Sequence, residues 1–206
     1  MKSLIKKIIL ILIGSIPGIV LIYKNNIECA KIYFIIYAIF VLLILLLTRK
    51  QKRVLFISST GGHLEELFQL KPLMDKYNFY FVTEINDTNK NLKDKYPNRI
   101  GYLAYGTRKN IIKYVFIFGF NILKSLYIYF KIKPKVIVTT GTHTAVPMCY
   151  IGKIFGSKII FIETFANRET KTLAGTIVYP IADLFVVQWK EMLKVYPKAV
   201  YLGGVY

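Results

Sequence analysis

The stretch Arg53-Val-Leu-Phe-Ile-Ser-Ser-Thr-Gly-Gly-His63-Leu-Glu-Glu-Leu67 decides the fold of this chain. Its pattern predicts a buried strand, a turn with two glycines, and a helix that opens with two acids. One of the chain's only two histidines therefore follows the carboxyl end of a first strand. Ligands bind at that edge in an open parallel α/β sheet. The stretch thus predicts both the start of such a sheet and a ligand site beside it.

Beyond Lys52, short β-branched or aromatic runs alternate with helical stretches. The predicted strands are Val54–Ser58, Phe79–Thr83, Gly101–Tyr105, Val136–Thr140, Lys158–Ile162, Leu184–Gln188 and Ala199–Leu202. The predicted helices are His63–Lys76, Asn110–Lys131, Thr144–Phe155, Lys171–Ile181 and Lys190–Tyr196. The polar, lysine-rich segment Asn86–Arg99 is predicted to be a loop. Strands that alternate with helices indicate βαβ units, so we expect one doubly wound, Rossmann-like parallel sheet over residues 53–206.

The composition is basic and apolar. The chain has 206 residues, of which 54% are hydrophobic, and a formal net charge of +18. This charge implies an anionic partner: nucleic acid, anionic lipid or a phosphate-bearing substrate. The lysines lie beside apolar runs, and no nucleic-acid-binding motif is recognisable, which favours lipid headgroups and diphosphate over nucleic acid. Cys29 and Cys149 lack CxxC spacing, so no metal or redox role is predicted for them.

Residues 1–50 are predicted to form a membrane anchor. The apolar runs Ile8–Tyr23 and Ile32–Leu47 are each near the short limit for crossing a bilayer. Basic residues on both outer flanks favour a helical hairpin with both ends in the cytoplasm; they are Lys2, Lys6, Lys7, Arg49, Lys50, Lys52 and Arg53. Gly14, Pro17 and Gly18 could kink the first run, so a single span with a surface-lying first segment stays open. A cleaved signal peptide is the other alternative, although no small-x-small site follows that run.

The segment Ile111–Phe130 is apolar nearly all round and is bordered by lysines. An all-apolar helix either covers the sheet as part of the core or faces lipid, with its lysines on anionic headgroups. Asn121 and Lys124 within the run argue against a third full span. Both alternatives stay open.

The turn after the first strand supplies Gly61, Gly62 and His63 as candidate site residues. Glycines allow a backbone to approach a phosphate closely, and the following helix N-terminus favours negative charge. A plain tight turn or a dinucleotide-binding turn is the alternative. The third glycine of GxGxxG is missing, but Glu84 ends the second strand where a ribose-binding acid would lie, so nucleotide cofactor binding also stays open.

The loop after the fourth strand supplies Thr140, Gly141, Thr142 and His143. Its hydroxyl groups would suit a diphosphate or sugar hydroxyls, while the alternative is that the threonines only cap a helix. This loop holds the second histidine, and parallel topology should bring it to the same sheet edge as the first.

The loop after the fifth strand supplies Glu163, Asn167 and Arg168. A carboxylate at a strand end, beside an amide and a guanidinium, is costly to bury unless it binds something. The alternative is that Arg168 forms a surface ion pair of little energetic value. Each loop alone is weak evidence for a ligand site. The more specific evidence is that all three loops should meet at one edge of the sheet.

Five pieces of sequence together resemble one family of transferases. They are Gly61-Gly62-His63, Val138-Thr-Thr-Gly141 with Pro147, Phe161-Ile-Glu163 with Asn167 and Gly175, Ala182-Asp-Leu-Phe-Val-Val-Gln-Trp189, and Tyr201-Leu-Gly-Gly-Val205. They resemble the membrane-anchored subunit of the two-component transferase that adds the second N-acetylglucosamine to a lipid-diphosphate-linked sugar. Bacterial relatives of that subunit serve in capsular and exopolysaccharide assembly. The N-terminal half of the lipid II-forming peptidoglycan transferase is also similar, although its histidine before the glutamate is Ile162 here.

The resemblance implies the acceptor-binding half of a GT-B glycosyltransferase, fixed to the cell membrane with its main domain in the cytoplasm. A separate soluble subunit would bind the UDP-sugar donor, so this chain would hold no cofactor or metal and would be inactive alone. His63 or Glu163 would act as the base or would orient it. Gly61, Gly62 and the helix start at His63 would cradle the acceptor phosphate or form the rim of the cleft. The remaining site residues would line the pocket for a polyprenyl-diphosphate-linked sugar; these are Thr140, Gly141, Thr142, His143, Asn167 and Arg168. A non-catalytic scaffold that docks a soluble enzyme is the main rival, and a nucleotide-dependent membrane oxidoreductase is a weaker one.

Overall fold

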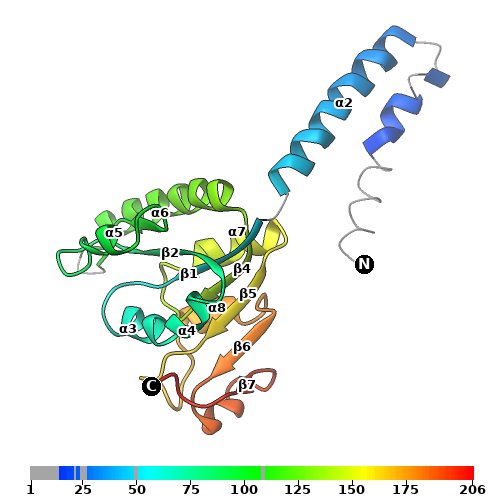
Figure 1. Ribbon diagram of the computed structural model, residues 1–206. Coiled ribbons are helices and arrows are strands. Elements are labelled where there is room, and N and C mark those ends of the chain that lie inside the picture. The colour runs from blue at the N-terminus through cyan, green and yellow to red at the C-terminus, as the bar shows by residue number, and fades with distance from the viewer. Residues whose placement is uncertain (1–13, 21, 24–26, 49–50, 108–109) are drawn as a thin grey trace. The chain divides into compact units, whose positions relative to one another are not determined.

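The computed structural model describes residues 14–20, 22–23, 27–48, 51–107 and 110–206. The chain divides into two compact units, Met1–Arg49 and Lys50–Tyr206, and we describe the residues of each unit that lie within these ranges separately (Figure 1).

The first unit contains α2, a helix of 22 residues from Ile27 to Thr48. A helix of this length is about 33 Å long, which matches a hydrocarbon core of about 30 Å. Residues 14–20 are also helical, and Cβ atoms added to Gly14 or Gly18 would overlap the rings of Tyr37 and Phe34 on α2. The predicted run Ile8–Tyr23 lies partly outside the described residues, so the membrane hairpin stays a prediction.

The second unit is built on a parallel sheet of seven strands in the order β3-β2-β1-β4-β5-β6-β7. The strands are β1 Gln51–Ile57, β2 Asn78–Glu84, β3 Ile100–Leu103, β4 Pro134–Thr139, β5 Lys158–Ile162, β6 Leu184–Val187 and β7 Val200–Tyr201. All the predicted strands are present, and the parallel α/β prediction is confirmed.

The helices of this unit are α3 Gly62–Gln69, α4 Lys71–Met74, α5 Leu92–Lys95, α6 Ile111–Ile132, α7 Val146–Ile154, α8 Leu173–Val178 and the 3₁₀ helix η1 Lys190–Leu193. Two details differ from the sequence predictions. The single helix predicted over His63–Lys76 is interrupted at Leu70, because Pro72 begins a new short helix there. The segment predicted as a loop contains the one-turn helix α5.

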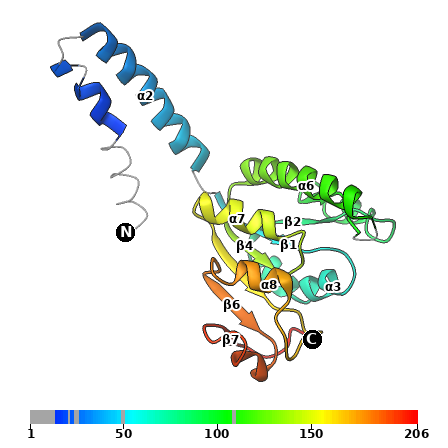
Figure 2. The same cartoon turned by 180° about the vertical axis from the view of Figure 1, so that it is seen from behind.

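Side chains alternate between the two faces of the sheet and build a core on each. Leu55 and Ile57 of β1 pack under α6, α7 and α8, whereas Phe56 between them packs against α3 and α4. The same alternation continues along the central strands, as a strand with period two requires. Figure 2 shows α6, α7 and α8 together on one face of the sheet. Cys149 of α7 lies within that core, and burial raises its pKa to about 12, so its thiol is unreactive.

The strand order reverses between β1 and β4, which defines the topological switch point of the sheet. From β1 the chain moves outward to β2 and β3 and then returns to place β4 on the other side of β1. The loops that leave the carboxyl ends of β1 and β4 therefore diverge and leave a crevice between them. Both histidines follow these strands, at positions 63 and 143.

Helix α6 is only half-buried. The Asn110 side chain caps its first turn by accepting a hydrogen bond from Lys113 N–H, and Lys133 ends it in a left-handed conformation before Pro134. Asn121 fixes its inner side through hydrogen bonds to both backbone polar groups of Ala104. Among the described helices, α6 is long and apolar enough to cross a membrane. Its inner side belongs to the core and its outer face is exposed, so contact of the outer face with lipid stays a prediction.

Candidate functional site

A pocket of about 320 Å³ lies at the switch point, where the loops after β1, β4 and β5 meet α6 and α8. The polar residues of the lining come from the first turn of α3, from the loops after β4 and β5, and from Thr172, the N-cap of α8. Most of the apolar residues come from α6, α7 and α8. The lining residues are His63, Tyr114, Phe118, Gly141, Thr142, His143, Val146, Glu163, Thr164, Thr172, Leu173, Ala174 and Ile177. The structure therefore brings His63, Gly141, Thr142, His143 and Glu163 to one pocket.

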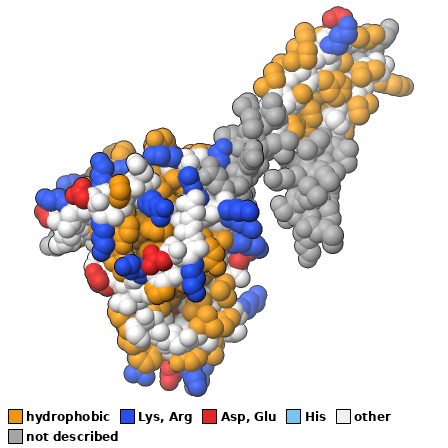
Figure 3. All heavy atoms as spheres, viewed as in Figure 1, with side chains coloured by type: hydrophobic (Ala, Val, Ile, Leu, Met, Phe, Trp, Pro, Cys, Tyr) orange, Lys and Arg blue, Asp and Glu red, His pale blue; other side chains and the backbone are white. Residues whose placement is uncertain are grey.

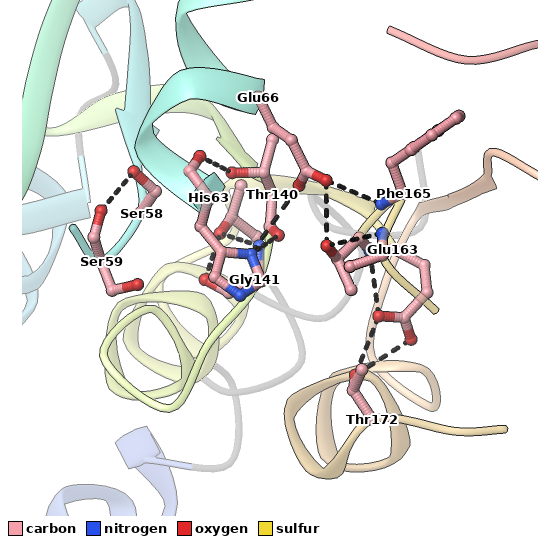
Figure 4. Close-up of polar contacts among 12 residues, drawn as sticks. Ser58, Ser59, His63, Glu66, Thr140, Gly141, Glu163, Phe165 and Thr172 are labelled. Atoms are coloured by element: carbon pink, nitrogen blue, oxygen red, sulfur yellow. Dashed lines mark hydrogen bonds and ion pairs between the residues drawn. The ribbon is translucent and has the colours of Figure 1, made fainter. Parts of the chain in front are cut away.

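His63 stands in the first turn of α3 and is anchored to the loop after β4. Its Nδ1 lies 3.0 Å from the carbonyl oxygen of Thr140, and the Thr140 hydroxyl donates to the His63 carbonyl oxygen at 2.7 Å (Figure 4). A carbonyl oxygen can only accept a hydrogen bond, so Nδ1 carries the ring proton. The neutral ring then has its lone pair on Nε2, and this nitrogen can accept a proton from a hydroxyl group in the pocket.

The loop after β4 is held in an uncommon backbone conformation. Gly141 has φ 104° and Thr142 has φ 76°. Glycine adopts such an angle freely, but a β-branched residue does so at a cost, and strain of this kind is concentrated at functional sites. The Thr142 hydroxyl oxygen is buried and has no hydrogen-bond partner among the described residues. Because Thr142 lines the pocket, this hydroxyl is a candidate partner for a ligand.

His143 pairs with a buried acid from β2. Its Nε2 lies 3.7 Å from Glu84, and its ring packs on Tyr114 at 5.4 Å between centroids. Glu84 accepts a hydrogen bond from the Thr144 hydroxyl, and burial raises the pKa of Glu84 despite this bond. The carboxyl group of Glu84 is therefore buried and turned toward the loop after β4, which does not favour the ribose-binding role that the sequence left open.

Glu163 connects the end of β5 to the start of α8. Oε1 accepts hydrogen bonds from Thr164 N–H at 3.1 Å and from the Thr172 hydroxyl at 2.9 Å. Oε2 accepts from Thr172 at 3.0 Å and from the Tyr196 hydroxyl at 2.8 Å. Burial and the neighbouring Glu163 raise the pKa of Tyr196, so its hydroxyl remains a donor. This arrangement holds the pocket wall in place and leaves little capacity on Glu163 to accept a substrate proton.

The opposite wall of the pocket is apolar. It is lined by Tyr114 and Phe118 from α6 and by Leu173 and Ile177 from α8. The pocket is thus amphipathic, with polar groups at the strand ends and hydrocarbon surface between the two helices. Such a lining fits a ligand that has both a polar and an apolar part.

The other predicted site residues lie outside this pocket. Gly61, with φ 71°, precedes α3, and Cβ atoms added at Gly61 or Gly62 would meet nothing within 4 Å. Gly61 instead borders a second hollow of about 350 Å³ beside the segment 88–95. Asn167 donates to the Thr170 carbonyl, and the Arg168 guanidinium stacks 4.4 Å from the Trp189 ring. Arg168 thus forms a cation–π contact rather than the ion pair that the sequence left open.

The sequence did not predict that Glu66 and Thr172 belong to the site, nor that Tyr114 and Phe118 of α6 line the pocket. Glu66 is one helical turn after His63, and this i,i+3 spacing places both on one face of α3, which was a usable signal. Thr172 caps α8 by accepting from Gly175 N–H, but a lone threonine gives no sign of its contact with Glu163. Tyr114 and Phe118 reach the pocket only through tertiary packing.

The surface of this unit is basic where Figure 3 shows it, with Lys and Arg side chains spread over the visible face and few acids among them. Across the described part of the chain, no group of three or more His, Cys, Asp or Glu side chains is arranged to hold a metal ion.

Comparison with known proteins identifies the family. Residues 53–205 match the family described as oligosaccharide biosynthesis protein Alg14 like. The chain belongs to the Alg14 family. The UDP-N-acetylglucosamine transferase subunit ALG14 of Rattus norvegicus is 27% identical over 183 residues, which cover 76% of this chain and 84% of that protein. The Alg14 subunit of Debaryomyces hansenii is 28% identical over 173 residues, covering 73% and 75% of the two chains.

Solved structures share the Rossmann-like fold of this Alg14 family member. MurG of Acinetobacter baumannii superposes with a TM-score of 0.56 at 14% identity, over 68% of this chain and 43% of MurG. The UDP-GlcNAc 2-epimerase of Methanocaldococcus jannaschii gives 0.56 at 14% identity, over 74% of this chain and 45% of the epimerase. The chain thus spans less than half of each of these proteins, and the likeness concerns the fold alone.

Proposed function

We propose that this chain is the membrane-anchoring, acceptor-side subunit of a two-chain, inverting UDP-N-acetylglucosamine-dependent transferase. Its acceptor is a polyprenyl-diphosphate-linked sugar used in capsular or exopolysaccharide assembly. The pocket at the switch point carries the proposal, because a candidate base, His63, and apolar side chains of α6 and α8 line it together. Membership of the Alg14 family, whose relatives are named as transferase subunits, supports the subunit role.

The amphipathic lining suits a lipid-linked sugar. The hydroxyl of Thr142 and the polar groups of the neighbouring loops would bind the sugar and the diphosphate, with His143 beside them. The wall formed by Phe118 and Leu173 would contact the first hydrocarbon units of the lipid. Helix N-termini and side chains can stabilise phosphate charge without a metal ion.

His63 is the proposed general base. Nε2 would take the proton from the acceptor hydroxyl, whose oxygen then attacks the anomeric carbon of the donor sugar as UDP leaves with the bonding electron pair. Attack opposite the leaving group inverts the anomeric centre. Three donors already bind the Glu163 carboxylate, Thr164 N–H and the hydroxyls of Thr172 and Tyr196, and this favours His63 over Glu163 for this step.

The donor site would belong to a soluble partner subunit. The described residues form one Rossmann-like unit, whereas a GT-B transferase closes two such domains over its substrates. Under this proposal the first unit fixes the complex to the cell membrane, the second faces the cytoplasm, and neither binds UDP-sugar by itself.

Binding measurements on the isolated full chain test this division of labour. In detergent, we expect it to bind a polyprenyl-diphosphate-linked sugar with a Kd between about 1 μM and 1 mM, and not to bind UDP-N-acetylglucosamine. Leu173→Asp places a charge on the apolar wall and should weaken acceptor binding about tenfold or more. Leu73→Asp, on α4, is the matched control. Tight donor binding by this chain alone would contradict the proposal.

The outer face of α6 is the proposed contact with the bilayer surface. Ile112, Phe116, Leu123 and Tyr127 recur at helical spacing, and their exposed fractions run from 66% to 75%. Lysines near both ends of α6 would contact anionic headgroups. We expect Phe116→Asp combined with Leu123→Asp to weaken binding of the unit Lys50–Tyr206 to anionic vesicles by roughly 10- to 100-fold.

Flotation with phosphatidylglycerol-containing vesicles measures this effect. Leu73→Asp again serves as the control, because it changes an exposed apolar residue on the opposite face of the sheet. Equal vesicle binding by the double variant and the control would show that α6 does not contact lipid.

A further inference from the structure

Glu66 is a buried acid next to the candidate base. It lies on α3 one turn after His63 and is 3% exposed. Oε1 accepts hydrogen bonds from the Thr164 hydroxyl at 2.9 Å and from Phe165 N–H at 2.7 Å, both on the loop after β5 (Figure 4). Oε2 is buried and has no hydrogen-bond partner among the described residues, and it lies 3.7 Å from Nδ1 of His63.

An unsatisfied carboxyl oxygen in the interior is unfavourable and requires an explanation. The hydrogen bonds of Oε1 do not offset the cost of burying Oε2, so packing alone does not account for a carboxylate at this position. The feature that Oε2 approaches is the imidazole ring. The Nδ1–H of that ring thus faces two acceptors, the Thr140 carbonyl at 3.0 Å and Oε2 at 3.7 Å.

We propose that Glu66 is a positioning residue for sugar transfer, which keeps the ring proton of His63 on Nδ1 and stabilises the cationic ring formed during the reaction. This inference rests on the proposed function. When the acceptor hydroxyl gives its proton to Nε2, the new C–O bond forms and UDP leaves. The ring then bears a positive charge, and a carboxylate behind it favours that state. Glu66 contacts neither substrate, so it acts only through His63.

Glu66 also sets where the ring stands relative to the rest of the pocket. Through Thr164 and Phe165 it fastens α3 to the loop after β5, while Thr140 fastens the same turn of α3 to the loop after β4. His63 is therefore held between two of the loops that form the pocket. A base fixed in this way needs no reorientation when the acceptor binds.

Glu66→Gln removes the negative charge of the side chain but keeps its size, so it distinguishes the effect of the charge from that of packing. The glutamine oxygen can retain the hydrogen bonds of Thr164 and Phe165, but its amide group would direct a donor at the Nδ1–H of His63. In the full chain purified with its partner subunit, we expect kcat to fall roughly 10- to 100-fold while the KM for the acceptor changes less than about twofold. Glu65→Gln is the matched control, because Glu65 is the preceding residue of the same helix and is exposed. It should behave as wild type.

Imidazole ¹⁵N spectra provide a readout that does not depend on activity. The chain has only two histidines, so a spectrum of histidine-labelled protein is simple, and His63→Gln assigns the signals. Wild type should show protonated Nδ1 and unprotonated Nε2 for His63, and Glu66→Gln should lower the population of this tautomer. Glu66→Asp keeps the acid on a shorter side chain, so it should recover part of the lost turnover; this variant decides the question if Glu66→Gln folds poorly.

Two results would overturn the inference: unchanged kcat in Glu66→Gln, or a lower kcat with an unchanged tautomer, which would mean that Glu66 only supports the loop. If the wild-type complex transfers no sugar, the proposed function fails instead. The ring spectra then still decide whether Glu66 controls the His63 proton, and identical spectra for wild type and Glu66→Gln would reject it.

Discussion

Replacing His63 with alanine is expected to lower the turnover of sugar transfer by roughly 100- to 10,000-fold, the usual contribution of a general base. The fold should survive, because the His63 side chain is 30% exposed and contributes a single side-chain hydrogen bond, to Thr140. Loss of that bond costs about 1 kcal/mol. Initial rates of transfer from UDP-N-acetylglucosamine, measured on the assembled complex, give the effect.

Gln69→Ala provides the control for this variant, since Gln69 lies on the exposed side of the same helix. Co-purification of the partner subunit with both variants should match wild type. Wild-type turnover from His63→Ala in an intact complex would remove the ring from the chemistry and favour the rival in which the chain only docks a soluble enzyme.

Glu163→Ala is expected to act on stability rather than on chemistry alone. It leaves the Tyr196 hydroxyl, the Thr172 hydroxyl and Thr164 N–H without their common acceptor in the interior. Leaving several buried donors unsatisfied should cost about 3–5 kcal/mol. For a unit of this size the melting temperature should then fall by roughly 6–20 °C. Thermal unfolding of the unit Lys50–Tyr206, followed by circular dichroism, measures the change.

Glu169→Ala is the matched control, because Glu169 lies exposed in the same loop and its removal should leave the melting temperature within about 2 °C of wild type. If Glu163→Ala unfolds like wild type yet abolishes transfer, Glu163 rather than His63 would be the better candidate for the base.

The sheet could be predicted from the sequence because its signal is local. Each strand is a short apolar run between polar or glycine-containing turns, and the bounds of Lys158–Ile162 agree with β5 residue for residue. Helix ends were less predictable. The break at Leu70 depends on Pro72, and α5 is a single turn of polar residues whose pattern does not differ from that of a loop.

The sequence predicted which loops form the site, but not which contacts their side chains make. Parallel topology alone brings the loops after β1, β4 and β5 to one edge, which is why His63, His143 and Glu163 were expected together and do line one pocket. Whether a side chain in such a loop points inward depends on partners far along the chain. Arg168 turns to Trp189, and Glu163 is held by Tyr196, and neither partner adjoins these residues in sequence.

The most direct test of the proposal that two polypeptides share the transferase activity is transfer of labelled N-acetylglucosamine from UDP to a polyprenyl-diphosphate-linked sugar in detergent. Three samples are compared: the full chain, the soluble donor-binding subunit, and the two together. We expect product only when both polypeptides are present, because the proposal assigns the acceptor and the base to this chain and the donor to its partner. Full activity from this chain alone would contradict the proposal that a second polypeptide completes the pocket.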